Sequence, residues 1–216
     1  MAPPSSRASI FAAIATTVLF FLAPSTRAQE DLPNFAHVTE MLYRGAQPSP
    51  AGLAALQHMG VGIVVNFREE SGATAAEKRD VESLGMSYVA IPWNGIHEPS
   101  NAQVVQFLDL VRNNAQTKIF VHCQRGADRT GTMIAAYRVA VEHKPVAEAV
   151  SEMRQFHYAR FWLPHLERYV ASLPSLLQAN ALFSAYAWVP NAPIPNAPAP
   201  DLSSTLTSAA VAVTAN

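Results

Sequence analysis

Apolar positions follow two periods along the middle of the chain, one typical of helices and one of buried strands. Val104, Phe107, Leu108 and Val111 recur at helical spacing, whereas VGIVVNF (61–67) is apolar on both faces, as in a buried parallel strand. Cap residues, glycines and prolines then divide the chain into elements. The predicted helices span 49–60, 72–85, 100–114, 130–143, 145–158 and 163–179, the last broken at Pro174, and the predicted strands span 61–67, 86–92 and 118–123, with an extra strand around 41–43 at the sheet edge. Strands that alternate with helices predict an α/β fold, with a short, mainly parallel central sheet flanked by helices.

Both ends of the chain depart from this pattern. The N-terminus carries a positive charge at Arg7, then an apolar run over positions 10–23, then small residues up to Ala28. This is the layout of a secretory signal peptide cut after Ala28, because the run is shorter than the roughly 20 residues that an uncleaved membrane anchor needs. The other end is rich in Pro and Ala and predicts a flexible tail. The expected division is a signal peptide (1–28), one domain (29–188) and a tail (189–216).

Composition and charge narrow the classes of function. The formal net charge of the chain is −1, and removal of Arg7 and Arg27 with the signal peptide makes it −3. Such a chain has no basic surface for nucleic acids. We therefore expect an exported, periplasmic or secreted protein, a monomer that is not inserted in a membrane after cleavage and that binds no nucleic acid.

The one cysteine of the chain, Cys123, stands where the strand 118–123 ends and a glycine-containing loop leads into a helix. Ligands of open α/β sheets bind at the carboxyl ends of the strands, and helix N-termini attract anions. Gly126 would let the backbone curl around a bound group, and Arg129 would fork two hydrogen bonds onto a tetrahedral oxyanion. The same positive surroundings would keep Cys123 a thiolate at neutral pH. The sequence therefore predicts a nucleophile inside a phosphate-binding loop.

The segment HCQRGADRTG (122–131) matches the signature H-C-x5-R-[ST]-G, and so the chain resembles the cysteine-dependent protein tyrosine and dual-specificity phosphatases. LYRGAQPS (42–49) and VVNFREE (64–70) resemble the opening segments of bacterial, plant and fungal atypical dual-specificity phosphatases. The resemblance covers about residues 38–172. It implies the three-layer cysteine-phosphatase fold and hydrolysis of phosphoesters, of the phosphotyrosine or phosphoprotein type, through a phosphocysteine intermediate. It implies neither a metal nor a cofactor.

The resemblance also implies roles for the matching residues. Cys123 would form the phosphocysteine, and Arg129 would bind the phosphoryl oxygens together with the loop amides. Thr130 would donate a hydrogen bond to the cysteine sulfur, and His122 would brace the loop rather than act as a base. The remaining loop residues, expected to bind substrate through their backbone, are Gln124, Arg125, Gly126 and Ala127.

The acid that protonates the leaving group is not evident. The related phosphatases use an aspartate on a separate loop, yet this chain has no aspartate between Asp80 and Asp109. The corresponding stretch IPWNGIHEPSN (91–101) offers only His97 and Glu98. Asp128, inside the nucleophile loop, is slightly favoured, and Glu98 is the second candidate. Because general-acid help is worth about 10²–10⁴-fold in rate, the choice matters most for poor leaving groups.

Three alternative functions remain open at this point. The first is a pseudophosphatase that binds phosphorylated ligands without turnover, which the uncertain acid allows. The second is an inositol-phosphate phosphatase, which the absence of lysine from the loop disfavours. The third is sulfur transfer by a rhodanese-like domain, whose cysteine loop is normally one residue shorter than this one.

Residues around the loop are expected to play structural parts. Arg44 should brace backbone carbonyls rather than contact substrate. Arg68 should form a surface ion pair with Glu69 or Glu70. The aromatic side chains of FHYARFW (156–162) should pack in the core.

Overall fold

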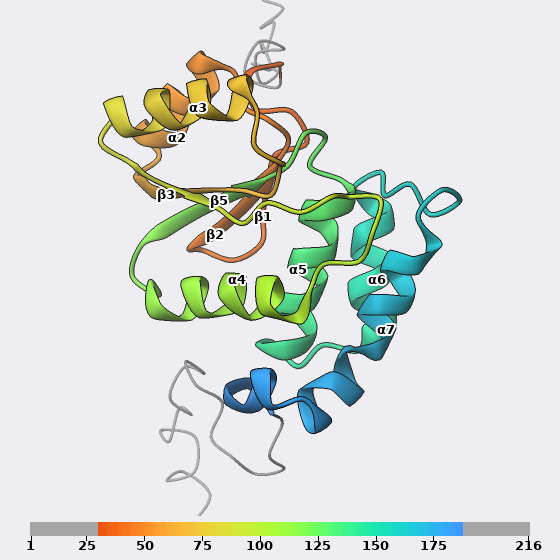
Figure 1. The fold of residues 1–216 in the computed structure, drawn as a ribbon. Coiled ribbons are helices and arrows are strands. Elements are labelled where there is room, and N and C mark those ends of the chain that lie inside the picture. The colour runs from red at the N-terminus through yellow and green to blue at the C-terminus, as the bar shows by residue number, and fades with distance from the viewer. Residues whose placement is uncertain (1–29, 188–216) are drawn as a thin grey trace, which may run out of the picture.

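Five short strands form the central sheet of the computed structural model, which describes residues 30–187 (Figure 1). In sheet order the strands are β1 (Ala36–His37), β2 (Leu42–Gly45), β5 (Lys118–His122), β3 (Val61–Asn66) and β4 (Ser87–Ala90). Only β1 runs antiparallel to its neighbour, and the other adjacent strands are parallel. The predicted α/β class and the short, mainly parallel sheet are confirmed. The predicted signal peptide and tail lie outside the described residues.

Helices cover both faces of this sheet (Figure 1). On one face lie α2 (Pro50–His58) and α3 (Gly72–Ser83), and on the other lie α4 (Asn101–Asn113), α5 (Asp128–Ala140), α6 (Val146–Gln155) and α7 (Pro164–Ala179), followed by the 3₁₀ helix η1 (Ala181–Tyr186). Two hydrophobic clusters fill the spaces between the layers. Because side chains alternate along a strand, Val64 enters one cluster and Val65 the other. Both faces of the sheet are therefore buried, as the doubly apolar strand pattern indicates.

Local signals account for where the helices begin. Ser49 accepts a hydrogen bond from Gly52 N at 3.0 Å and precedes a proline in the first turn of α2. Ser71 and Ser100 form capping boxes at the starts of α3 and α4. These caps explain why the predicted helix starts agree with the structure.

Three predictions about the elements are wrong. The strand expected around 41–43 at the edge is β2, which lies inside the sheet between β1 and β5. Helix α7 is not broken at Pro174 but continues to Ala179, because Leu173 and Leu177 on either side are buried in the core and offset the hydrogen bond that proline cannot donate. Helix α6 ends at Gln155 rather than at 158, because the left-handed backbone of His157 (φ 65°) does not continue the helix.

The strand register brings four chain segments together at one edge of the sheet. Gly45 pairs with His122, His122 with Asn66, and Asn66 with Ala90, so the carboxyl ends of β2, β5, β3 and β4 form a single row. Cys123 follows His122 directly and therefore lies at the middle of this row. The fold places the cysteine at the edge where ligands of parallel sheets bind.

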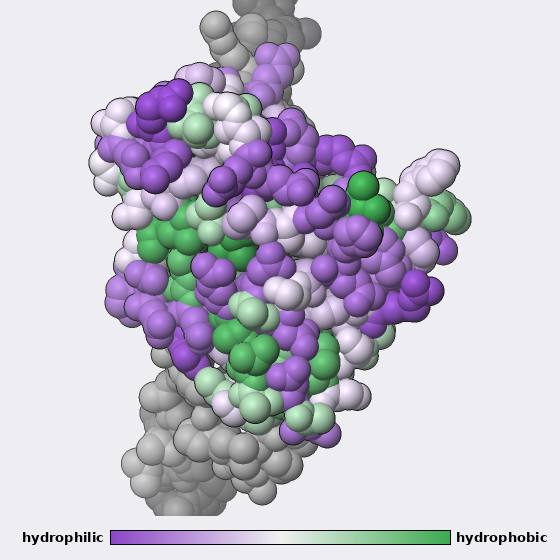
Figure 2. Space-filling view, viewed as in Figure 1, coloured by the Kyte–Doolittle hydropathy of each residue, from purple (hydrophilic) through white to green (hydrophobic). Residues whose placement is uncertain are grey.

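On the face seen in Figure 2, hydrophilic side chains cover most of the surface, and apolar side chains gather in a few patches between them. Phe161 and Trp162 are exposed, with exposed fractions of 84% and 86%. The expectation that the aromatic side chains of 156–162 pack in the core is thus wrong for this pair, although Tyr158 is buried. Within residues 30–187, none of the helices has the length and apolar character needed to cross a membrane.

Candidate active site

The loop of residues 123–127 connects β5 to α5, and its carbonyl groups are held from outside. Four carbonyl oxygens in succession, from Cys123 to Gly126, each lie within hydrogen-bond distance of a nitrogen atom, which belongs to the adjacent residue for Cys123 and to residues 34–47 for the other three. The pairs are His122 Nδ1 with Cys123 O at 3.2 Å, Gln47 N with Gln124 O at 3.3 Å, Asn34 Nδ2 with Arg125 O at 3.1 Å, and Arg44 Nη2 with Gly126 O at 2.9 Å. We call these four contacts the carbonyl clamps.

The clamps decide what the loop presents to a ligand. The amide groups of residues 124–127 donate no hydrogen bond to any of the described residues. With the carbonyl oxygens held outside, these unpaired amides and the first turn of α5 provide donors for an anion. Cys123 itself is 2% exposed at the base of this loop. The arrangement is that of an anion cradle built around a thiol.

Gly126 fits the loop against the neighbouring strand. Its backbone is left-handed (φ 67°), and a Cβ atom at this position would lie 2.4–2.6 Å from the backbone of Gly45 and Ala46. Only glycine combines this conformation with such close packing. From the sequence, we expected Gly126 to make room for a bound group. In the structure, its missing side chain makes room for the end of β2.

Arg44, a clamp residue with a charged side chain, is fully buried. Its guanidinium carbon lies 3.7 Å from the centre of the Phe156 ring, and its Nη1 lies 3.8 Å from Glu152 Oε1. Burial lowers the pKa of Arg44 to about 10, a change opposed by the charges of Glu152 and Cys123. The expectation that Arg44 braces a backbone carbonyl is confirmed by its bond to Gly126 O.

Arg129 lies in the first turn of α5, where its side chain crosses the ends of two other strands. Its Nη1 donates to Phe67 O at 3.4 Å and to Trp93 O at 3.3 Å. A Cβ atom on Gly95 would lie only 3.2 Å from Arg129 Nε, so the loop after β4 rests directly on this side chain. Nε and Nη2 have no hydrogen-bond partner among residues 30–187, which leaves one edge of the guanidinium for an anion.

Asp128 has both carboxylate oxygens engaged. Oδ2 accepts from Arg125 Nη2 at 2.5 Å, and Oδ1 accepts from the backbone amide of Ala159 at 2.9 Å. The residue is 9% exposed. These contacts tie the nucleophile loop to the loop between α6 and α7, and they favour a structural role for Asp128 over the acid role that the sequence slightly favoured.

The alternative acids, His97 and Glu98, are exposed on the loop between β4 and α4. That loop reaches the site, since Trp93 and Gly95 both contact Arg129. Glu98 lies near Tyr169 of α7. The pKa of Tyr169 is raised mainly by burial and further by the charge of Glu98. The structure therefore leaves Glu98 free of the ion pair that occupies Asp128.

His122 and Thr130 are both fully buried. His122 contacts the Cys123 carbonyl through Nδ1, as a bracing role requires. The hydroxyl of Thr130 has no hydrogen-bond partner among the described residues, so its expected bond to the cysteine sulfur is not formed in this structure. Arg68 bonds Gln47 rather than Glu69 or Glu70, and the predicted ion pair is wrong.

Sequence reasoning missed three residues that hold the loop. Asn34 and Gln47 supply two of the carbonyl clamps, and Glu77 lies buried beside His122. Asn34 is 91 positions from its partner Arg125, and no local pattern marks such a contact. A buried acid in a helix with a polar face, such as Glu77, is equally hidden in the sequence.

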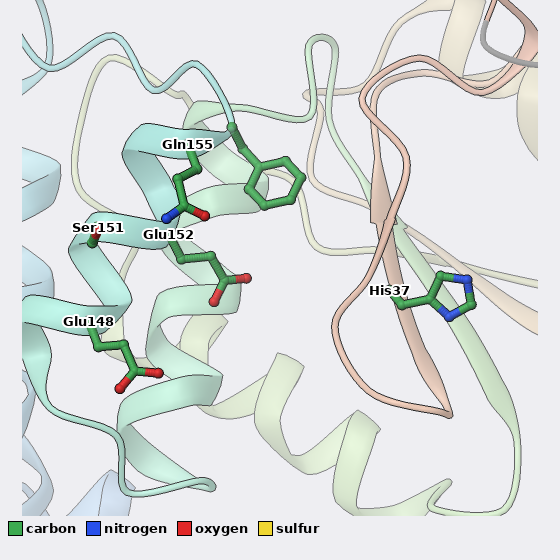
Figure 3. Close-up of a pocket in the computed structure, with 6 residues that line it drawn as sticks. His37, Glu148, Ser151, Glu152 and Gln155 are labelled. Carbon is green, nitrogen blue, oxygen red and sulfur yellow. The ribbon is translucent and has the colours of Figure 1, made fainter.

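A separate pocket of about 280 Å³ opens between α6 and β1 (Figure 3). Glu148, Ser151, Glu152 and Gln155 of α6 line one side, and His37 lies opposite them. None of the residues 122–131 lines it, although Glu152 also contacts Arg44. The pocket therefore lies behind the bracing residues and is not the anion cradle. Among residues 30–187 there is no group of three or more His, Cys, Asp or Glu side chains suited to hold a metal ion.

Comparison with known proteins agrees with this geometry. The chain is similar to the protein named tyrosine-protein phosphatase OCA1 from Saccharomyces cerevisiae, with 29% identity over 66% of this chain and 62% of OCA1. It is 28% identical to the dual specificity protein phosphatase TpbA from Pseudomonas aeruginosa over 56% of this chain and 54% of TpbA. The chain thus matches about half to two thirds of the length of these two relatives.

Solved structures share the fold. The crystal structure of P. aeruginosa TpbA superposes with a TM-score of 0.59, at 23% identity, over 72% of this chain and 91% of that chain. The core catalytic domain of the PP-IP phosphatase Siw14 from S. cerevisiae gives a TM-score of 0.56, at 18% identity, over 69% of this chain and 93% of that chain. A family model described as "DSP-PTPase phosphatase fused to NAD+ Kinase" matches residues 16–161, more than half of the sequence. The chain therefore belongs to this DSP-PTPase phosphatase family.

Proposed function

We propose that this protein is a metal-independent phosphatase that hydrolyses phosphoesters through a phosphocysteine intermediate on Cys123. The observation that carries the proposal is the set of carbonyl clamps, which hold the carbonyl oxygens of residues 123–126 outside and leave the amides of residues 124–127 unpaired. Such a preorganised cradle stabilises the charge of a phosphoryl group in its transition state. The thiol at its base is the nucleophile that the cradle would serve.

In the first step the Cys123 thiolate attacks phosphorus. A sulfur–phosphorus bond forms as the bond to the leaving oxygen breaks, and the leaving oxygen takes up a proton. The unpaired amides and the Nε–Nη2 edge of Arg129 bind the equatorial oxygens, while Nη1 of Arg129 keeps its bonds to the carbonyls of Phe67 and Trp93. In the second step water attacks phosphorus, the sulfur–phosphorus bond breaks, and phosphate leaves with the thiolate regenerated.

The leaving-group proton comes from Glu98 rather than from Asp128 in this proposal. Asp128 is paired with Arg125 and with the amide of Ala159, and these contacts hold both of its carboxylate oxygens in place. Glu98 is exposed on the loop that rests on Arg129 through Gly95. Closure of that loop over a bound substrate would bring the carboxyl to the leaving oxygen.

Phosphotyrosine-type or phosphoprotein esters are the substrate class that we propose. Support comes from TpbA, whose cysteine-to-serine variant has been crystallised in complex with pTyr. The rival class is inositol phosphates, since Siw14 is described as a PP-IP phosphatase. Against it stands the charge of the loop, where Arg125 is paired with Asp128 and no lysine is present.

We also propose that the protein is exported. The support is the pattern of residues 1–28, with Arg7, an apolar run and small residues before Ala28. N-terminal sequencing of the protein recovered outside the producing cytoplasm should then begin at Gln29. A cell-associated chain that still begins at Met1 would overturn the proposal.

The experiment for the function is phosphate release from nitrophenyl phosphate, phosphotyrosine peptides, inositol phosphates and nucleotides, by the wild type and by Cys123→Ser. We expect turnover of the first two substrates, abolished in the variant. The variant should still bind vanadate or phosphate, because its cradle and Arg129 are intact. Binding without turnover by the wild type would identify a pseudophosphatase, and preference for inositol phosphates would replace the proposed substrate class.

A further inference from the structure

A buried carboxylate lies behind the nucleophile loop and has no part in the chemistry described so far. Glu77, on α3, is only 4% exposed. Its Oε1 lies 2.5 Å from Gln47 Nε2 and 3.1 Å from His122 Nε2, and its Oε2 accepts from Asn66 Nδ2 at 2.9 Å. A buried charge without such partners would be strongly unfavourable. The protein has therefore built a site for this carboxylate.

Two of these partners also hold the loop. His122 contacts the carbonyl of Cys123 through Nδ1, and the backbone amide of Gln47 donates to the carbonyl of Gln124. A single oxygen of Glu77 thus contacts both residues that provide the first two carbonyl clamps. Any movement of Glu77 would be transmitted to the carbonyl groups of Cys123 and Gln124.

The neighbours of His122 indicate its protonation. Nδ1 faces a carbonyl oxygen, which only accepts hydrogen bonds. Nε2 lies 3.1 Å from the carboxylate of Glu77, close enough for an ion pair, although the geometry is not that of a hydrogen bond. A neutral imidazole has one N–H and one lone pair. In either tautomer that lone pair would face an oxygen, whereas a ring protonated on both nitrogens suits both neighbours.

We propose that Glu77 is a positioning residue for phosphoryl transfer, which holds His122 protonated on both ring nitrogens and thereby fixes the Cys123 carbonyl and keeps a positive charge on the residue next to the nucleophile. The proposal rests on the function proposed above. Positive charge close to a cysteine favours the thiolate over the thiol. Loss of the carboxylate should then reduce the fraction of thiolate at mildly acidic pH without removing the nucleophile.

Three other titratable groups lie close to the pair, to its partner Gln47 or to the thiol. Tyr88 of β4 accepts from Asn66 Nδ2 at 2.7 Å, and burial is the main cause that raises its pKa, so it stays neutral near pH 7. Arg68, after β3, reaches the pair through Gln47. Arg44 of β2 interacts with Cys123 through its charge. Tyr88 and Arg44 do not change charge near neutral pH. The pH dependence is therefore assigned to the glutamate, the histidine and the thiol.

The decisive variant is Glu77→Gln, because glutamine keeps the volume and can donate its amide to a neutral His122 while the negative charge is lost. We expect kcat/KM for nitrophenyl phosphate to fall about tenfold at pH 6 and to recover as the pH rises, since one nearby charge changes thiolate formation by this order. The rate at which iodoacetamide alkylates Cys123 should move to higher pH in parallel. A purely structural role would lower the rate equally at every pH.

Matched variants separate the possible outcomes. Glu82→Gln removes an exposed acid from the same helix and should leave both pH profiles unchanged. His122→Gln removes the charge from the other partner, so it should shift both pH profiles as Glu77→Gln does. The double variant should show no further shift. If Glu77→Gln does not fold, His122→Gln provides the same test. Unshifted profiles in Glu77→Gln would overturn the role of Glu77. Alkylation needs no turnover, so it tests the role of Glu77 even if the wild type hydrolyses no phosphoester. A wild type without phosphoester hydrolysis would refute the proposed function instead.

Discussion

Backbone groups, more than side chains, form the surface that the nucleophile loop offers to an anion. The carbonyls of residues 124–126 are bound by donors from a distant part of the chain, and the side chains among these donors, Asn34 and Arg44, never need to touch the substrate. Because the cradle is assembled before a ligand arrives, little reorganisation is needed in the transition state. The residues that matter most for catalysis therefore include several that lie behind the loop.

Gly126 provides the sharpest test at this scale. Gly126→Ala should lower the free energy of unfolding by about 2–5 kcal/mol and abolish activity, because alanine would be strained at this φ and would overlap the backbone of Gly45. The control is Gly85→Ala, where φ is also positive (78°) but no atom lies within 4 Å of the added Cβ. That variant should cost only about 1–2 kcal/mol. Equal losses in chemical denaturation would show that packing against β2 is unimportant.

At the scale of elements, the site exists because four parallel strands end in one row. The loop after β2 supplies Gln47, and the segment after β3 supplies the Phe67 carbonyl that holds Arg129. The loop after β4 carries Glu98, and the loop after β5 carries the cysteine. Asp128 then joins this edge to the loop between α6 and α7 through Ala159. A change in one loop is thus expected to affect the others.

Leaving-group dependence distinguishes the two candidate acids. Glu98→Gln should slow hydrolysis of an alkyl phosphate about 10²-fold or more but hardly affect nitrophenyl phosphate, and it should remove the basic limb of the pH–rate profile. Asp128→Asn should slow both esters by similar factors, since it weakens the contacts to Arg125 and Ala159 rather than proton transfer. The opposite selectivity would return the acid role to Asp128. If neither variant discriminates between the esters, no side-chain acid operates.

The elements could be predicted from sequence where their signals are local. A serine cap placed the start of α2, Gly85 marked the end of α3, and helical spacing of apolar residues placed α4. The signature 122–131 located the nucleophile loop. The position of β2 inside the sheet could not be predicted, because strand order depends on pairing between distant segments. The clamp from Asn34 and the partner of His122 were missed for the same reason.

At the scale of the whole molecule, Cys123 is the only cysteine in the chain. A nucleophilic thiolate is oxidised first to sulfenic acid, which a second cysteine in the same protein would capture as a disulfide. This chain offers no such partner, so oxidation should proceed to the irreversible sulfinic acid. The predicted enzyme is therefore sensitive to its redox surroundings.

Peroxide inactivation measures this sensitivity. Brief treatment should remove activity that dithiothreitol restores, and longer treatment should remove it permanently, with sulfinic acid found at Cys123 by mass spectrometry. Inorganic phosphate should slow the loss, because an anion in the cradle covers the thiol. Activity that survives complete oxidation of Cys123 would contradict a thiolate mechanism.

The most direct test of the central claim is to trap the covalent intermediate. The wild type, mixed with nitrophenyl phosphate and quenched in acid during turnover, should yield a peptide spanning residues 118–129 that carries one phosphoryl group on Cys123. The intermediate should disappear when the substrate is exhausted, and Cys123→Ser should give neither the adduct nor turnover. Sustained phosphate release by that variant, or turnover by the wild type with the phosphoryl group on another residue, would contradict the account.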